Sequence, residues 1–361
     1  MKITDVRGFQ LKPYPKKLKF FDKMPPHTFE RALVRIATDD GLEGQCVTYL
    51  MSPAELGQRL PGLRQFLIGR DPHDIEMISY ALTAGLERPS HVASTIDICL
   101  WDLLGKHHKT PIYKLLGAAR HRIRAYASTY SYETIDEYVQ ISLEAKGQGF
   151  SALKLHAHGV PDKDIAVCKA VREAVGDDMD LMIDPVNAYE RAGALKVGRA
   201  LEELNFVWLE APIPDTDLAG LADLTRRLTI PIAAVESVFG GLRAYPPYLI
   251  QNTVGALRSV GDAIGGITAM RKTAALCEAF HVKYEPHSYG TTLVQAAHLH
   301  LMLSIFHCDF VEVPVPLGMW DEGMKSGMQV GADGYVQAPT LPGLGYELDE
   351  DAIRDMVVRE F

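Results

Sequence analysis

Eight short apolar runs, each separated from the next by a helix-compatible segment, occupy the chain from about residue 122 to residue 314. This alternation is typical of βαβ units, in which parallel strands are buried on both faces by the connecting helices. Eight such units favour a closed barrel over an open sheet. We therefore predict an α/β fold built on a (β/α)8 TIM-like barrel. The runs are IRAYAST, ALKLHAH, LMIDP, FVWLEAP, IAAVES, ALRSVGD, VKYEPHS and FVEVP.

The segment before the barrel has a mixed pattern. KITDVRGFQL alternates like a strand, and residues 31–50 read as two strands around the turn Asp40-Gly41, a strong hairpin signal. Between them, the aperiodic stretch KPYPKKLKFFDKMPPHTFE is predicted to be an ordered loop. Helical spacing of apolar residues predicts helices over 53–69, about 74–86 and 91–108.

These patterns divide the chain into three parts. Residues 1–120 are predicted to form an α+β capping domain, and residues 121–330 the barrel. The Gly- and Pro-rich segment 331–361 is predicted to pack back on the capping domain.

Composition excludes several classes of partner. The net charge of −9, with no basic run, argues against nucleic acid. The five cysteines include no CxxC pair, which argues against a zinc site or a disulfide framework and favours a cytoplasmic location. No apolar run approaches the roughly 18 residues of a membrane span. These exclusions leave a small molecule as the expected partner of this chain.

The C-terminal ends of barrel strands build the active site of this fold. From the second run onward, every strand is predicted to end in an ionisable residue. A purely structural barrel has no reason to place charge there. In chain order these residues are Lys154 and His156, Asp184, Glu210, Glu236, Asp262, His287 and Glu312.

The three central carboxylates, Asp184, Glu210 and Glu236, are spaced by 26 residues each. One βα repeat fits that interval, so they are expected at one height on adjacent strands. Three converging carboxylates repel one another, and a divalent cation removes the repulsion. Oxygen-only ligands indicate Mg²⁺, with Mn²⁺ as an alternative.

Ionisable side chains flank this predicted metal site on both sides. Lys154 and His156 are two residues apart, so both face the mouth of the barrel. Asp262 and His287 come from neighbouring strands and are predicted to pair, with the carboxylate orienting the imidazole. This layout suits removal of a proton next to a carboxylate, with metal and Lys154 stabilising the enolate charge.

The ordered set of motifs resembles the enolase superfamily, and within it the mandelate racemase subgroup. The resemblance covers nearly the whole chain. It is carried by STIDICLWDLLGKHHKTPIYKLLG, LMIDPVNAY, VWLEAPIP, AAVES, GDAIGGIT, EPHS and PGLGYEL.

The resemblance implies a role for each strand end. Asp184, Glu210 and Glu236 would be the metal ligands. Asp262 and His287 would form the His–Asp dyad, and Glu312 would hydrogen-bond the substrate carboxylate. The N-terminal domain would cap the barrel, the 12–31 loop would close over the substrate, and the chain would form a homo-oligomer.

One position departs from the subgroup. The second strand usually ends in Lys-x-Lys, and here it ends in Lys154-x-His156. His156 is then either a weaker base or a hydrogen-bond donor to a substrate hydroxyl. This favours dehydration of an acid sugar, an aldonate or aldarate, to a 2-keto-3-deoxy product, with His287 as the main acid and base. A racemase, epimerase or lactone cycloisomerase, and a non-catalytic sugar-acid binder, remain the alternatives.

Some residues have weaker signals. Asn187, Phe20, His27 and Trp320 are candidate substrate contacts, although each is also compatible with a loop-anchoring role. His158 is predicted to lie in a loop. His298, His300 and His307 fall on a helical stretch and are predicted to be surface or interface histidines.

Overall fold

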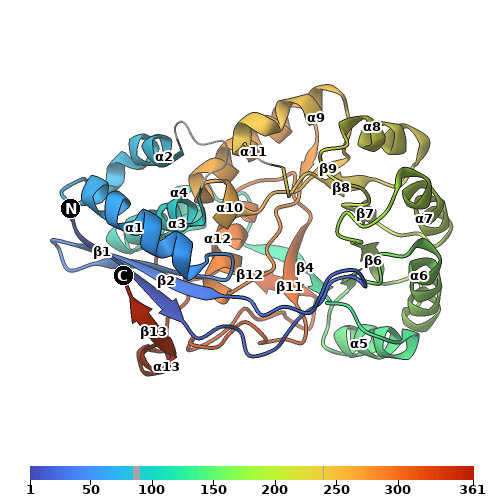
Figure 1. The fold of residues 1–361 in the computed structure, drawn as a ribbon, viewed down its shortest axis with the longest axis horizontal. Coiled ribbons are helices and arrows are strands. Elements are labelled where there is room, and N and C mark those ends of the chain that lie inside the picture. The colour runs from blue at the N-terminus through green and yellow to red at the C-terminus, as the bar shows by residue number, and fades with distance from the viewer. Residues whose placement is uncertain (84–89, 239) are drawn as a thin grey trace.

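The computed structural model describes residues 1–83, 90–238 and 240–361. In this part of the chain, a four-stranded antiparallel sheet lies beside a parallel sheet that curls into a barrel (Figure 1). The fold class predicted from the sequence is confirmed. Both chain termini lie at the antiparallel sheet, which we call the cap.

The cap sheet has the strand order β13-β1-β2-β3, so the last strand of the chain pairs with the first. The hairpin predicted around Asp40-Gly41 is confirmed, and Gly41 supplies the positive φ of 81° that the turn requires. The strands are β1 (Ile3–Leu11), β2 (Arg31–Thr38), β3 (Glu43–Thr48) and β13 (Val357–Glu360).

Helix α3 (His91–His107) joins the cap to the barrel. It is buried on nearly all sides because it is packed between the cap sheet and the barrel helix α11. Trp101 Nε1 donates to Thr268 Oγ1 at 2.9 Å, and Asp97 Oδ1 accepts from the backbone of Thr268 at 3.0 Å. The other helices of this region are α1 (Pro53–Leu67), η1 (Pro72–Asp74), α2 (Ile75–Thr83) and α4 (Ile112–Leu115). The predicted continuation of a helix to about residue 86 lies outside the described residues.

The barrel sheet of the described residues holds eight parallel strands in the order β10-β9-β8-β7-β6-β5-β4-β11. Each overlaps one of the eight apolar runs, so the sequence pattern located all of them. They are β4 (Arg122–Ser128), β5 (Ala152–Leu155), β6 (Asp180–Ile183), β7 (Trp208–Glu210), β8 (Ile232–Ala234), β9 (Ala256–Leu257), β10 (Lys283–Tyr284) and β11 (Phe310–Pro314).

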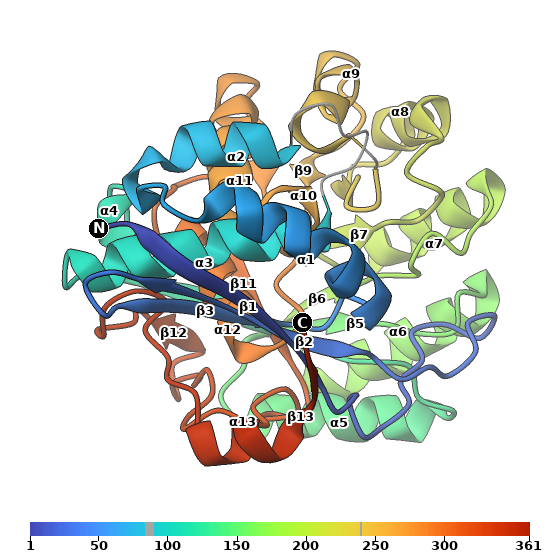
Figure 2. The same cartoon turned by 60° about the vertical axis from the view of Figure 1, so that its left-hand side comes forward.

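Helices cover the outside of this sheet and the cap covers its mouth (Figure 2). Capping is visible in the sequence: Thr134 and Glu137 form a reciprocal capping box at the start of α5. The helices are α5 (Ile135–Gly147), α6 (Pro161–Val175), α7 (Arg191–Glu203), α8 (Leu218–Arg227), η2 (Gly241–Ala244), α9 (Pro246–Ile250), α10 (Gly261–Ile264), α11 (Gly266–Ala279) and α12 (Thr292–Met302).

The seam between β10 and β11 closes the barrel with few backbone bonds. Tyr284 N donates to the carbonyl of His307 at 2.8 Å. Side chains supply the rest: the Glu285 carboxylate accepts from the backbone of Asp309 at 2.7 Å, and Ser288 Oγ donates to the carbonyl of Glu312 at 3.0 Å. Buried polar side chains therefore replace a regular ladder at this edge.

The C-terminal segment contacts both parts of the molecule. Its first strand, β12 (Tyr335–Gln337), pairs with β4 of the barrel. Helix α13 (Glu350–Met356) and strand β13 return to the cap, where Arg35 contacts Glu350 at 2.7 Å. No helix among the described residues is long and apolar enough to cross a membrane. All five cysteines are buried free thiols.

The prediction that His298 and His300 lie at the surface is wrong. Both are fully buried on α12, which is buried on all sides because it packs between the cap and the barrel. His298 Nε2 accepts from the backbone N–H of Gly261 at 2.9 Å, and His300 Nδ1 accepts from that of Tyr113 at 3.1 Å. These acceptor roles require neutral imidazoles. His307 is half-buried.

We expect the buried neutral His300 to make the protein less stable in acid. Burial lowers its pKa to about 4 from the ordinary 6.5. Below pH 6.5, His300 binds a proton in the unfolded chain but not in the folded chain. The free energy of unfolding therefore falls until the pH reaches about 4. The full effect is roughly 3 kcal/mol. Denaturant unfolding at a series of pH values should show a shallower loss between pH 6.5 and 4.5 in His300→Gln than in the unsubstituted protein.

Candidate active site

Alternate strands of the barrel point two successive layers of side chains inward. Strands β5, β7, β9 and β11 first carry the apolar layer of Ala152, Trp208, Ala256 and Phe310, in which small and aromatic residues alternate and the two aromatic rings pack against each other. Four side chains per layer from alternate strands is the packing rule of this barrel. Two residues further along each strand lie Lys154, Glu210, Arg258 and Glu312, each at most 1 % exposed.

These four residues form a closed ring of alternating charge, which we call the charge ring. Lys154 Nζ lies 2.8 Å from Glu210 Oε1 and 2.9 Å from Glu312 Oε1. On the other side, Arg258 Nε lies 2.8 Å from Glu210 Oε1, and Arg258 Nη2 lies 3.0 Å from Glu312 Oε2. Each cation therefore contacts both carboxylates, so two buried charges of each sign compensate one another.

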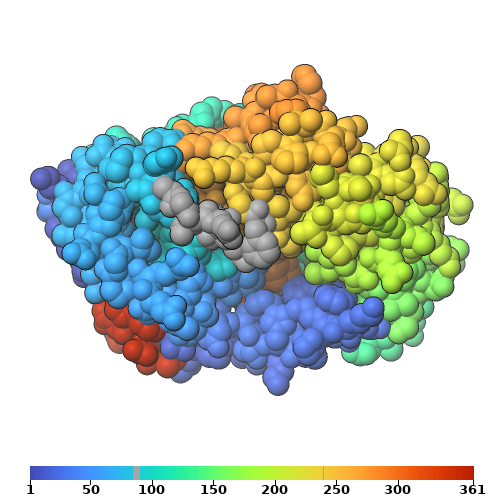
Figure 3. Space-filling view, turned by 45° about the horizontal axis from the view of Figure 1, so that its top comes forward, coloured from blue at the N-terminus to red at the C-terminus, as the bar shows by residue number. Residues whose placement is uncertain are grey.

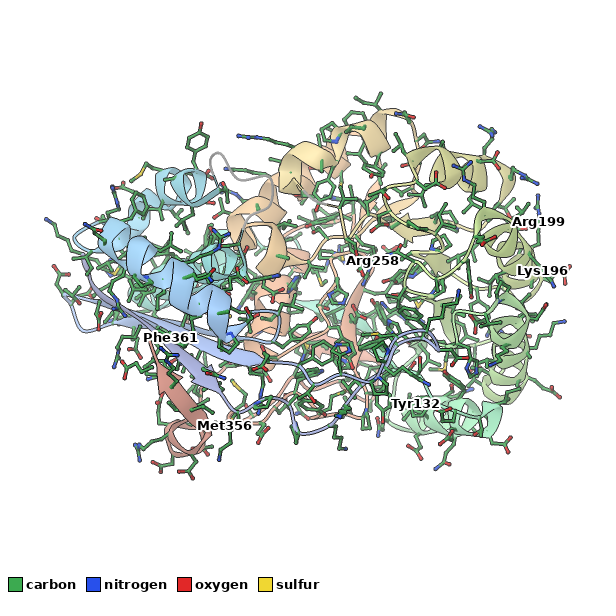
Figure 4. All side chains as sticks on the ribbon, viewed as in Figure 1. Tyr132, Lys196, Arg199, Arg258, Met356 and Phe361 are labelled. Carbon is green, nitrogen blue, oxygen red and sulfur yellow. The ribbon has the colours of Figure 1, made fainter. Side chains whose placement is uncertain are left out.

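Arg258 is the functional residue that sequence reasoning missed. The prediction that the sixth strand ends in Asp262 is wrong, because β9 ends at Leu257 and Arg258 is the next residue to face inward. Its backbone N–H still bonds the carbonyl of Ala234 at 2.9 Å. In Figure 4, Arg258 lies inside the barrel, whereas Lys196 and Arg199 lie on the outer helix. The signal was its position two residues after Ala256, the spacing that links Ala152 to Lys154.

The other two predicted ligands lie on the strands between those of the charge ring. Asp184 follows β6; its Oδ1 accepts from the backbone of Val186 at 2.7 Å, and its Oδ2 lies 3.9 Å from Lys154 Nζ. Glu236 follows β8, and its Oε2 lies 3.6 Å from Arg258 Nε. That oxygen is buried and has no hydrogen-bond partner among the described residues.

A strained backbone aims Glu236 at the mouth. Val235 has a φ of +77°, which is rare for a β-branched residue. The carboxylate of Asp215 holds this turn by accepting from the backbone of Val235 at 2.9 Å and of Ser237 at 2.8 Å. Strain of this kind is typical of functional sites.

The mouth holds more carboxyl groups than the cations among the described side chains can neutralise. Burial raises the pKa of Glu210 to about 8 and that of Glu236 to about 7, even though Arg258 and Lys154 oppose the rise. If all four carboxyl groups, including Asp184 and Glu312, were ionised, the described cations Lys154 and Arg258 would leave two negative charges unbalanced. The arrangement therefore has room for two further positive charges.

This charge and these donors fit a divalent cation. The donors are carboxylate oxygens, which Mg²⁺ prefers, and Glu236 Oε2 has no other partner among the described residues. As they stand, the described side chains do not form a ready group of three ligands, because Lys154 and Arg258 lie between the carboxylates. Asn187 adds an amide oxygen that is buried without a partner in the described part of the chain.

His287 follows β10 and lies at the mouth as a neutral imidazole. Burial lowers its pKa to about 3, and the positive charges of Arg258 and Lys154 act in the same direction. The ring keeps some exposure, but its Nδ1 is buried and has no hydrogen-bond partner among the described residues. A neutral imidazole with an unused nitrogen can accept a proton.

The predicted pair of Asp262 and His287 is not formed in this arrangement. None of the hydrogen bonds among the described residues joins them, because Asp262 lies on the short helix α10, beyond the point where Val260 pairs with His287. The carboxylate turns toward the cap instead, where Asp262 Oδ2 accepts from Thr48 Oγ1 at 2.8 Å. Its Oδ1 has no partner within the described ranges.

His156 is held in a fixed orientation opposite His287. Its Nδ1 lies 2.6 Å from the carbonyl of Thr129, and a carbonyl only accepts, so Nδ1 carries a proton. Its Nε2 lies 3.2 Å from Asp184 Oδ2, a second acceptor. Both ring nitrogens therefore face oxygen acceptors, an environment that suits a proton donor. This hydrogen bond and the charge of Lys154 outweigh burial and hold the pKa of Asp184 well below its usual range.

Lys154 and Glu312 are both ionised. Burial works against the charge of Lys154, but Glu210 and Glu312 outweigh it and raise the pKa of the amine well above its usual value. Lys154 therefore serves as a cation and not as a base. The charges of Lys154 and Arg258 overcome burial and lower the pKa of Glu312. Ser128 Oγ and Ser288 N also donate to its oxygens, so this arrangement does not favour the predicted hydrogen bond to a substrate carboxylate.

An aromatic cluster from the cap and the barrel lies over the mouth. Phe20, in the loop between β1 and β2, packs with its ring centroid 5.0 Å from that of His156 and 5.5 Å from that of Tyr289. Trp320 packs against Tyr14 at 4.4 Å in the same cluster. The structure thus brings Phe20 and Trp320 to one cluster. His27 packs against Phe29 at the edge of this cluster.

The loop that carries Phe20 is fastened to the barrel. The N–H of Ser131 donates to the carbonyl of Lys19, and the N–H of Asp22 donates to the carbonyl of His158, both at 2.8 Å. His158 lies in the loop after β5, as predicted, and its Nδ1 contacts Asp22 Oδ1 at 3.1 Å. The space-filling view shows this blue segment lying against the green part of the barrel (Figure 3).

The barrel, the cap and the strand-end carboxylates define an enolase-type protein, and comparison with known families agrees. Residues 23–117 match the mandelate racemase / muconate lactonizing enzyme N-terminal domain, and residues 138–352 match the enolase C-terminal domain-like family. The chain belongs to the enolase superfamily, in its mandelate racemase-like subgroup.

Several relatives are named enzymes. The chain is 30% identical to D-galactarolactone cycloisomerase of Agrobacterium fabrum, over 98% of both chains. It is 28% identical to L-talarate/galactarate dehydratase of Salmonella typhimurium, over 89% of this chain and 81% of the relative. The structure of D-glucarate dehydratase from Agrobacterium tumefaciens complexed with magnesium superposes with a TM-score of 0.85, at 30% identity over 99% of this chain and 100% of the other. Names of this kind support a hydro-lyase, with an isomerase as the second reading.

Proposed function

We propose that this chain is a Mg²⁺-dependent acid-sugar dehydratase. It would remove the proton next to the carboxylate of an aldonate or aldarate and eliminate the neighbouring hydroxyl, giving a 2-keto-3-deoxy acid. The observation that carries the proposal is the presence of two differently surrounded imidazoles at one barrel mouth: His287 has an Nδ1 with no partner among the described residues, and both nitrogens of His156 face oxygen acceptors. Elimination of water needs one base and one acid, and these surroundings suit His287 as the base and His156 as the acid.

The residues that would hold Mg²⁺ are Asp184, Glu210 and Glu236. When bound, the ion supplies positive charge that stabilises the enolate form of the substrate carboxylate. The charge ring adds to this, because Lys154 is a permanent cation fixed below the mouth. Its geometry is set before the substrate arrives, so it needs no reorganisation as negative charge develops.

The proton path follows from the two imidazoles. His287 would accept the α-proton. His156 would donate its Nε2 proton to the departing hydroxyl, and its Nδ1–H would stay on Thr129. The aromatic cluster with Phe20 and Trp320 would exclude bulk water from the closed site.

A lactone cycloisomerase is the second candidate, because D-galactarolactone cycloisomerase is among the relatives. It would use the same base and acid but expel a ring oxygen instead of a hydroxyl. A panel of aldonates and aldarates, each offered as the open acid and as the lactone with Mg²⁺, separates the two. A keto product with loss of one water supports the dehydratase, and a keto product of unchanged mass supports the cycloisomerase. Absence of any keto product across the panel would contradict both.

Replacing His156 by Gln should separate proton abstraction from elimination. Exchange of the α-proton with deuterium from the solvent should stay within a few-fold, because His287 is intact. Elimination should fall by about 10²-fold, the lower end for loss of a general acid. Proton NMR of the substrate measures both rates in one sample.

The matched control is His158→Gln, two residues further along, where the imidazole contacts Asp22 and not the mouth. It should leave the ratio of exchange to elimination unchanged. If exchange and elimination fall together in His156→Gln, His156 is not the acid of the leaving group.

A further inference from the structure

One cation of the charge ring, Arg258, lies beside two of the three proposed metal ligands. Arg258 Nε lies 2.8 Å from Glu210 Oε1 and 3.6 Å from Glu236 Oε2. The Nε–H is buried and makes no hydrogen bond to any described residue, so both contacts are purely electrostatic. The hydrogen bonds of the other two nitrogens therefore position the guanidinium, and its Nε lies beside the proposed metal ligands.

Those other nitrogens fix the side chain. Arg258 Nη1 donates to Tyr126 Oη at 3.2 Å and to the carbonyl of Glu285 at 3.1 Å, and Nη2 donates to Glu312 at 3.0 Å. At 1 % exposure the side chain has no water to turn toward. Arg258 therefore stays beside Glu210 and Glu236 whether or not another cation is present.

Arg258 and a divalent ion would compete for the same two carboxylates, Glu210 and Glu236. Glu210 Oε1 already contacts Lys154 and Arg258, and its Oε2 accepts from Trp208 Nε1 at 3.0 Å. A metal ion at this carboxylate would share it with a fixed positive charge a few ångströms away, and like charges repel strongly where water is excluded. Without Arg258, Glu210 and Glu312 would each lose a cation, and the metal-free mouth would hold uncompensated buried charge.

We propose that Arg258 is a built-in counter-ion, which keeps the carboxylates of the mouth ordered in the metal-free protein and thereby weakens their affinity for Mg²⁺. This rests on the proposed function, in which Asp184, Glu210 and Glu236 hold the ion. The protein would then fold with a complete mouth before metal arrives and would release the ion readily. Arg258 is a positioning residue in this account, acting through Glu210 and Glu236.

The test compares Mg²⁺ binding and thermal unfolding, without substrate, in the purified full chain and its variants. Arg258→Met removes the charge and keeps a long side chain. It should bind Mg²⁺ at least about tenfold more tightly by calorimetry. Its melting temperature should be lower than that of the unsubstituted protein in EDTA, and Mg²⁺ should raise it by a larger amount.

A second variant, Arg258→Lys, keeps the inference testable if Arg258→Met does not fold. Lysine keeps the charge of the ring but lacks the Nε–H that lies beside Glu210 and Glu236, so the Mg²⁺ affinity of this variant should rise only a few-fold. The matched control is Arg172→Met. Arg172 is a buried arginine whose guanidinium donates to backbone carbonyls, among them Leu204 and Met179, far from the ligands. This control should melt earlier with an unchanged response to Mg²⁺.

Two outcomes separate the inference from the proposed function. If the unsubstituted protein binds Mg²⁺ and Arg258→Met and Arg258→Lys bind it equally or more weakly, Arg258 supports the ligands and the inference is overturned. If neither the unsubstituted protein nor any variant binds Mg²⁺ or Mn²⁺, the metal assignment itself fails and the inference falls with it.

Discussion

Replacing His287 by Asn should abolish proton abstraction by this protein. The imidazole is neutral because burial lowers its pKa to about 3, and its Nδ1 has no other partner among the described residues. Asparagine keeps a polar side chain of similar reach but cannot accept the α-proton. Loss of a general base costs about 10²–10⁴-fold in rate. Both elimination and deuterium exchange at the α-carbon should fall by this factor, measured by proton NMR.

His300→Asn is the control for this result. His300 is also a fully buried neutral histidine, but it accepts from the backbone of Tyr113 at the cap and does not reach the mouth. It should keep activity within a few-fold at neutral pH. If His287→Asn still exchanges the α-proton at the unsubstituted rate, the base lies on the opposite face and His156 becomes the candidate.

Replacing Asp184 by Asn should remove Mg²⁺ binding. Asparagine can still accept from the backbone of Val186 through its amide oxygen, so the local turn is preserved. The change removes one of the negative charges that fit a divalent cation. Substitutions that only support a metal ligand cost 10–100-fold in affinity, so loss of a ligand should cost at least about 100-fold. Calorimetric titration with Mg²⁺ measures this directly.

Asp164→Asn is the matched control for the charge. Asp164 is a fully buried carboxylate on α6, held by Tyr189 Oη at 2.6 Å and by the backbone of His158. It lies outside the mouth, so this variant should bind Mg²⁺ as the unsubstituted protein does. Unchanged affinity in Asp184→Asn would show that the metal assignment is mistaken.

Periodicity explains why the barrel could be predicted. Continuous apolar runs indicate strands that are buried on both faces. The equal spacing of Asp184, Glu210 and Glu236 corresponds to the length of one βα repeat. The alternation of side chains along a strand then placed Lys154 and His156 on one face. These are local rules, and the structure follows them.

The features of the site that the sequence did not predict depend on where a strand ends and on which distant segments pack against it. Arg258 was overlooked because the sixth run continues to Asp262, whereas β9 ends at Leu257. Neither the sequence of β3 nor that of α10 shows that Thr48 would bind Asp262. The burial of His300 likewise depends on Tyr113, which lies 187 positions away in the chain. Long-range contacts of this kind leave no periodic signal.

The most direct test of the account is proton NMR of an acid-sugar panel incubated with the protein and Mg²⁺ in deuterated water. We expect one aldonate or aldarate to lose its α-proton signal and to gain the methylene signal of a 2-keto-3-deoxy acid, with neither change in EDTA. Deuterium incorporation without elimination would contradict dehydration and indicate a racemase or epimerase. Retention of every α-proton signal would contradict proton abstraction itself.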